Sequence, residues 1–170
     1  TLLIVDVQEK LLPVIPQATA LTATMNFLQQ AAAVMKLPVI ISEQYPKGLG
    51  PTVATVKDAS PAASVIEKLR FSAAREFQDI VALERHQVVV CGIEAHICVL
   101  QTALELQHAG YEVFVVADAI GSRQAADYNN AITRLQHRGV IVCQAESVVF
   151  EWCEQAGTDD FRAISRLVRE

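Results

Sequence analysis

The chain has 170 residues, a length that predicts a single domain over residues 1–170 with one sizeable core. Its net charge of −5 argues against a nucleic-acid partner or an anionic membrane surface, because both require a basic face. Apolar residues make up 52% of the chain, which favours a sheet covered on both faces and an apolar patch covered in a homo-oligomer.

Short, unbroken apolar runs alternate with helical patterns along the chain. The predicted strands are 2–7, 38–41, 64–67, 88–91, 113–117 and 140–143, and the predicted helices are 18–36, 74–85, 95–109, 124–138, 146–156 and 159–169. Continuous Val/Ile runs are typical of strands buried on both faces of a parallel sheet. The alternation predicts an α/β fold, a Rossmann-like three-layer α/β/α sandwich with a six-stranded parallel sheet.

Two further features concern the chain's connections and its start. The connection 44–63 is long and contains three prolines and two glycines, so we expect it to be a functional lid or binding loop. No stretch has the roughly 20 apolar residues needed to span a bilayer, and no leader pattern is present. The chain begins inside a predicted strand, so we expect that residues preceding Thr1 are missing.

Most histidines and cysteines fit structural positions. His108 and His137 close helical patterns that are followed by Gly110 and Gly139, and His86 lies at a helix-to-strand junction. We interpret Cys91, Cys143 and Cys153 as small buried hydrophobic residues, because no CxxC pair or compact disulfide spacing is present. This cysteine usage indicates a reducing, cytoplasmic location.

The strand ends exclude several familiar chemistries. Asp6 ends the first strand without the glycine-rich turn of a dinucleotide site, and no P-loop is present. Neither a second carboxylate two residues on, as in aspartyl-phosphate phosphatases, nor the lysine of a receiver domain after the fifth strand is found. Lys68 ends the third strand, where a lysine can also simply mark the solvent edge.

Cys98 carries the strongest single indication of chemistry. The segment from Val88 to Val99 reads as a strand, a glycine and the first turn of a helix, with Cys98 in that turn. Unpaired amides at a helix start lower a thiol's pKa and can bind an oxyanion, so we expect a reactive thiolate. The alternative is a buried core thiol.

Asp6, Lys68 and Cys98 come from the carboxyl ends of three strands, where an α/β sheet places its site. We expect Asp6 to accept the thiol proton, Cys98 to attack, and Lys68 to supply positive charge to both anions.

The chain resembles the isochorismatase-like cysteine hydrolases, which include nicotinamidases and N-carbamoylsarcosine amidohydrolases. The matching segments are Leu3-Ile4-Val5-Asp6-Val7-Gln8, Lys68 with Phe71-Ser72, Gly92-Ile93-Glu94-Ala95-His96-Ile97-Cys98-Val99, and Val116-Ala117-Asp118-Ala119. The resemblance implies a six-stranded parallel sheet and an Asp–Lys–Cys triad at Asp6, Lys68 and Cys98. It also implies a cis peptide between Ile93 and Glu94, and an oxyanion hole formed by the amides of Glu94 and Cys98.

The chain departs from nicotinamidases in the segment after the second strand. Their Asp-x-His…His metal site is replaced by Ser42-Glu43-Gln44-Tyr45, and no histidine precedes His86. We therefore expect no catalytic metal, no other cofactor and no nicotinamidase activity. Isochorismatase itself lacks the cysteine nucleophile, so Cys98 favours an amidohydrolase.

Three flanking residues, Gln8, Tyr45 and Phe71, are candidates for lining the substrate pocket, although each also fits a packing role. A Cys98–His96 dyad is disfavoured, because residues two apart on a helix do not face each other. We expect a metal-independent hydrolase that cleaves an amide or carbamoyl C–N bond of a small molecule through a thioester. The alternatives are a non-catalytic oligomeric scaffold and a redox-active thiol.

Overall fold

The computed structural model describes residues 1–81 and 84–169, and its centre is one parallel sheet. The strands are β1 (Leu2–Val5), β2 (Val39–Gln44), β3 (Ser64–Lys68), β4 (Gln87–Ile93), β5 (Glu112–Gly121) and β6 (Ile141–Cys143). Every strand pair is parallel, in the order β3-β2-β1-β4-β5-β6. The predicted fold class and six-stranded sheet are confirmed.

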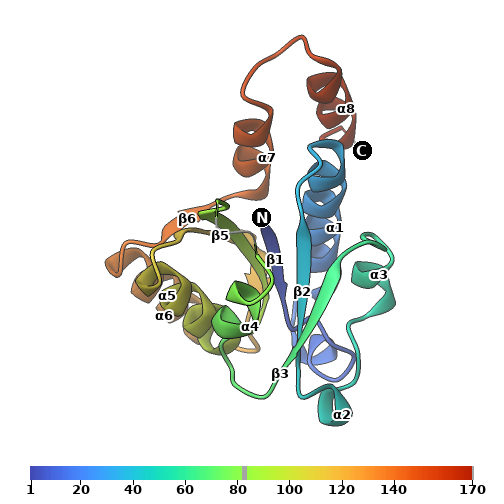
Figure 1. The fold of residues 1–170 in the computed structure, drawn as a ribbon. Helices are drawn as coiled ribbons and strands as arrows, with labels where there is room; N and C mark the ends of the chain where they lie inside the picture. Colours follow the sequence, from blue (N-terminus) through green and yellow to red (C-terminus); the bar gives the residue numbers. More distant parts are fainter. Residues whose placement is uncertain (82–83, 170) are drawn as a thin grey trace.

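Helices cover both faces of this sheet (Figure 1). They are α1 (Ala18–Val34), α2 (Pro46–Leu49), α3 (Ala54–Lys57), α4 (Ala74–Gln78), α5 (Leu100–His108), α6 (Ala125–His137), α7 (Ala145–Cys153) and α8 (Asp159–Leu167), with a 3₁₀ turn η1 (Leu12–Val14) and a π-helical turn η2 (Ala95–Val99). Helix α1 packs with α7 and α8, and α5 packs with α4 and α6. Within residues 1–81 and 84–169, none of the helices combines the length and the apolar character that a membrane span requires.

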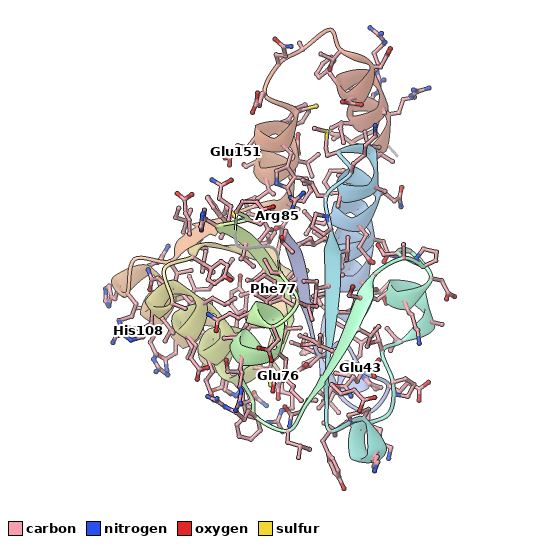
Figure 2. All side chains as sticks on the ribbon, in the orientation of Figure 1. Glu43, Glu76, Phe77, Arg85, His108 and Glu151 are labelled. Carbon is pink, nitrogen blue, oxygen red and sulfur yellow. The ribbon has the colours of Figure 1, made fainter. Side chains whose placement is uncertain are left out.

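Strand β1 shows why the strands read as unbroken apolar runs. Leu2 and Ile4 pack into the core on the α1 side, whereas Leu3 and Val5 pack into the core on the α5 side. Successive side chains of a strand point to opposite faces, so a strand covered on both faces needs apolar residues throughout. Phe77 of α4 packs in the α5-side core (Figure 2). Its ring lies edge-on to the ring of Tyr111.

The element boundaries differ from the sequence prediction at several points. Helix α4 ends at Gln78, whereas the predicted helix ran to 85, and its positions 82–83 lie outside the described residues. Four strands extend beyond their predicted ends, with β2 ending at Gln44, β3 at Lys68, β4 at Ile93 and β5 at Gly121.

Two of the predicted helix ends are confirmed. Gly110 and Gly139 follow α5 and α6 with φ of +94° and +80°, the left-handed backbone that ends a helix. His108 lies at the outer end of α5 (Figure 2), and His137 is the last residue of α6.

Strand order reverses at β1, and this feature positions the site. The chain proceeds from β1 outward to β2 and β3, then returns to the other side of β1 with β4. In such sheets, the crevice at the carboxyl ends beside the reversal point is where ligands bind. Asp6 directly follows β1 at this point.

Candidate active site

Asp6 is held rigidly between the ends of β1 and β2. Its N–H donates to the Ser42 carbonyl at 3.1 Å, and its Oδ1 accepts a hydrogen bond from Ser42 Oγ at 2.7 Å. The backbone of Asp6 is left-handed, with φ of +53°, and the residue has no exposed surface. The turn after β1 therefore directs this carboxylate into the protein rather than into solvent.

Lys68, the last residue of β3, forms a buried ion pair with Asp6. Its Nζ lies 2.6 Å from Asp6 Oδ2, and neither side chain has exposed surface. The same Nζ donates to Gln44 Oε1 at 2.9 Å, to the Phe71 carbonyl at 2.8 Å and to the Arg70 carbonyl at 3.3 Å. The interpretation of Lys68 as a solvent-edge lysine is therefore wrong, and the protein itself engages all three N–H groups of its ammonium.

Cys98 reaches the same carboxylate from β4 through a tight turn. Gly92 has φ of +121°, and a Cβ there would lie 2.1 Å from the Val5 carbonyl oxygen, so only glycine fits this crossing. The peptide bond between Ile93 and Glu94 is cis. Cys98 follows in η2, where its thiol lies beside Asp6 and the residue is 6% exposed.

The ionisation of Cys98 differs from the sequence expectation. Burial raises the pKa of the Cys98 thiol, and the neighbouring Asp6 carboxylate raises it further, whereas Lys68 lowers it. The direction of this shift is therefore opposite to the lowering of the thiol pKa that the helix start predicted.

Burial also raises the pKa of Asp6, against the opposing effect of Lys68 and of hydrogen bonds to its carboxylate. A raised carboxylate pKa makes Asp6 a stronger proton acceptor when the thiol reacts.

A second buried carboxylate, Glu94, lies at the start of the turn that leads to Cys98. Its Oε2 accepts from Arg123 through both the backbone N–H, at 3.0 Å, and Nε, at 3.1 Å. The Glu94 carbonyl accepts from the N–H groups of Ile97 and Val99. Glu94 thus connects the turn that leads to Cys98 with Arg123, which follows β5.

His96 does not pair with Cys98. Its Nδ1 lies 2.9 Å from Ser122 Oγ, and its Nε2 lies 3.8 Å from Asp127 Oδ2. The imidazole is therefore directed toward the start of α6, and the disfavoured Cys–His dyad is not formed.

The three candidate pocket residues have different surroundings. Gln8 has no exposed surface, and its amide bonds three main-chain groups, which are the Gln44 N–H, the Gln44 carbonyl and the Gly50 carbonyl. The structure contradicts a pocket-lining role for Gln8. Tyr45 is 51% exposed, and its N–H donates to the Lys68 carbonyl. Phe71 is 54% exposed, and its carbonyl accepts from the Lys68 ammonium. Both residues therefore remain candidates for lining the pocket.

The connection 44–63 is anchored rather than free. Glu43 accepts hydrogen bonds from the N–H and Oγ1 of Thr52 at 2.7 and 2.8 Å, on the side of the sheet where α2 and α3 lie (Figure 2). Glu43 therefore binds the connection through both the main chain and the side chain of Thr52. Across residues 1–81 and 84–169, no group of three His, Cys, Asp or Glu side chains is placed to hold a metal ion.

Ser42 contacts Asp6 and Gln44 contacts Lys68, and both residues were missed by sequence reasoning. Both lie on the part of β2 beyond Ile41, where the predicted strand ended. The strand register could have revealed them. Because β2 runs parallel to β1 and continues past the end of β1, its last residues lie beside Asp6.

A hollow of about 380 Å³ has none of Asp6, Lys68 and Cys98 in its lining. Its wall includes Ile15 and Leu21 before and in α1, and Asp118, Ser122 and Tyr128 at the end of β5 and in α6. Ser122 connects this hollow to the turn carrying Cys98, through its contact with His96. The candidate site is therefore defined by Asp6, Lys68 and Cys98 rather than by this hollow.

The fold is that of an α/β protein with a candidate site at the carboxyl edge of its parallel sheet. The sequence pattern of the Isochorismatase domain matches residues 1–147, and the chain belongs to this family. It is 33% identical to a secreted isochorismatase effector of Phytophthora sojae, over 99% of this chain and 84% of the relative.

Solved structures share the fold. A structure described as the MAR1 ribonuclease of Caenorhabditis elegans has a TM-score of 0.90 at 32% identity, covering 99% of this chain and 88% of that one. The YcaC gene product of Escherichia coli, described as an octameric hydrolase of unknown specificity, has a TM-score of 0.90 at 24% identity, covering 98% and 85%.

Proposed function

We propose that this protein is a metal-independent cysteine hydrolase that cleaves an amide or carbamoyl C–N bond of a small molecule. One observation carries the proposal, namely that a single buried carboxylate, Asp6, pairs with the Lys68 ammonium at 2.6 Å and lies beside the Cys98 thiol. A nucleophile next to a base whose position is fixed by a third group is the general arrangement of covalent catalysis. Membership of the isochorismatase domain family supports a hydrolase.

The proposed reaction has two halves. Sulfur of Cys98 attacks the substrate carbonyl carbon while Asp6 accepts the thiol proton, and the oxyanion binds the amides of Glu94 and Cys98. The C–N bond then breaks, the departing nitrogen takes the proton from Asp6, and a thioester remains. In the second half Asp6 accepts a proton from the attacking water, and the departing sulfur recovers that proton.

Lys68 acts in this scheme through its charge. Because its three N–H groups are engaged by Asp6, Gln44 and the Phe71 carbonyl, the ammonium has no free donor for the substrate. It stabilises the negative charge that moves between Asp6 and Cys98, and it keeps the carboxylate oriented.

The test is a screen of small amides, carbamoyl compounds and hydroxamates, with release of ammonia or amine as the readout. We expect turnover that survives a chelator and is lost in Cys98→Ala and Asp6→Asn, together with a thioester adduct seen by mass spectrometry. Hydrolysis of RNA in place of the amides, or turnover that persists in Cys98→Ala, would refute the proposal.

A non-catalytic scaffold is the second candidate, and the burial and raised pKa of Cys98 favour it. It predicts no turnover in the screen and no adduct on Cys98.

We further propose that the chain forms a homo-oligomer, since the large hydrophobic side chains of Tyr45, Leu69 and Phe71 are exposed. We also propose a cytoplasmic location, since all four cysteines are free. Light scattering of the purified chain tests the first, and microscopy of a tagged full-length protein tests the second.

A further inference from the structure

We propose that Gln44 is a positioning residue that holds the Lys68 ammonium against Asp6 and thereby sets the reactivity of Cys98. The inference rests on the proposed function, because it assigns Gln44 a part in the reaction of that thiol. It begins with the hydrogen bonds of the Gln44 side chain, which is almost completely buried at the end of β2.

The Gln44 side chain is matched to its two partners by chemistry. Its Oε1 accepts from Lys68 Nζ at 2.9 Å, and its Nε2 donates to the Leu69 carbonyl at 2.8 Å. An ammonium only donates and a carbonyl only accepts, so the position requires one acceptor and one donor on the same group. An amide meets both requirements, whereas a carboxylate meets only the first and a thioether meets neither well.

The main chain of Gln44 is fixed from the other side by Gln8, two residues after Asp6. Gln8 Oε1 accepts from the Gln44 N–H at 2.8 Å, and Gln8 Nε2 donates to the Gln44 carbonyl at 3.0 Å and to the Gly50 carbonyl at 2.6 Å. These contacts form a closed ring. The main chain links Asp6 to Gln8, and hydrogen bonds link Gln8 to Gln44, Gln44 to Lys68, and Lys68 back to Asp6. Movement of Gln44 would therefore displace the ammonium.

The charge of Lys68 acts on both reacting groups. It lowers the pKa of Asp6 and of Cys98 against the burial that raises both. Loss of the Gln44 contact would let the ammonium move away from the pair, and both groups would then bind their protons more tightly. A carboxylate at position 44 would add a negative charge beside the same ammonium and act in the same direction.

The test follows the rate of Cys98 alkylation by acrylamide between pH 6 and pH 10, in the full chain. Sulfur adds to the terminal alkene carbon and solvent supplies the proton to the neighbouring carbon, and peptide mass mapping reads out the labelled cysteine. We compare wild type with Gln44→Met, Gln44→Glu and a control, Gln155→Glu, which makes the same charge change at an exposed loop position. Thermal melting is measured on the same samples.

We expect both Gln44 variants to react about tenfold more slowly at pH 8, with their pH profiles displaced upward by about one unit, and the Gln155 variant to match wild type. A purely structural glutamine predicts lower melting temperatures with an unchanged profile, and that result would overturn the inference. The inference would also be overturned if Gln44→Met alone kept the wild-type pH dependence of Cys98 alkylation. Alkylation requires no turnover, so a failure here is distinct from the absence of amide hydrolysis.

Discussion

The Lys68 ammonium and the Asp6 carboxylate lie 2.6 Å apart, with no exposed surface on either side chain. Removal of one partner leaves the other charge buried and unpaired. We therefore expect Asp6→Asn and Lys68→Met each to lower the free energy of unfolding by about 3–5 kcal/mol. The double variant should recover much of that loss, because it leaves no unpaired charge, while remaining inactive. Urea denaturation of the three variants checks this, and a double variant as unstable as the two single losses combined would contradict it.

The exposed ion pair between Arg70 and Glu105 is a matched control for this prediction. Its N–O distance is 3.1 Å, but the side chains are 56% and 43% exposed. Solvent screens such pairs, so Arg70→Met should change the free energy of unfolding by only about 0–1 kcal/mol. The contrast separates the effect of burial from the effect of pairing.

Two fully buried glutamines, Gln8 and Gln29, should respond in opposite ways to replacement by methionine. Gln8 satisfies three main-chain groups, and their loss should cost about 3 kcal/mol or more. Gln29 makes one long bond to Asn26, at 3.3 Å, and its Oε1 lacks a partner within the described residues. Gln29→Met should therefore be neutral or stabilising, as measured by urea denaturation. Equal losses in the two variants would contradict this.

Gly92 and Gly110 both have positive φ, but they should tolerate alanine differently. A Cβ at Gly92 would lie 2.1 Å from the Val5 carbonyl oxygen, whereas a Cβ at Gly110 meets nothing within 4 Å. Gly110→Ala should cost only the backbone strain of about 1–2 kcal/mol. Gly92→Ala should cost more and displace the turn that carries Cys98, which soluble yield, melting temperature and acrylamide labelling together measure. Similar melting temperatures for both variants would refute the close approach.

Buried thiols should make the protein less stable at alkaline pH. Burial raises the pKa of Cys91, and burial with the charges of Glu151 and Asp118 raises the pKa of Cys143 to about 11, against a value of 9.0 in the absence of the fold. Between about pH 9 and pH 11 the unfolded chain therefore binds fewer protons than the folded chain, and the free energy of unfolding falls as pH rises. Urea titrations at pH 8 and pH 10.5 should show this decline, and Cys143→Ala should reduce it. A decline of equal size in that variant would exclude Cys143 as a source.

The sequence was sufficient to predict the layers of the fold because the inner strands carry long apolar runs. Leu2–Val5 has no polar position, whereas the edge strand β3 contains Ser64, Glu67 and Lys68 and is partly exposed. The strand ends were less predictable, since β2 continues through Ser42, Glu43 and Gln44. These polar residues are buried by specific partners that lie far along the chain, and no local pattern reveals such partners.

The candidate triad followed from the topology, whereas its electrostatics did not. Asp6, Lys68 and Cys98 each end or follow a strand, so parallel pairing brings them to one edge. The direction of the pKa shift of Cys98 depends on burial, which cannot be read from a helix-start pattern. For Gln8, the pattern showed only proximity to Asp6, and the structure shows that its amide is fully used by the main chain.

The left-handed backbone at Asp6 has a consequence for how the position can change. Aspartate and asparagine adopt this conformation far more readily than other residues with a Cβ. The turn therefore restricts the choice of residue before any chemistry does, and an alanine there would combine loss of the carboxylate with a strained main chain. Asparagine removes the charge alone, so its effect can be attributed to proton transfer and pairing rather than to a distorted turn.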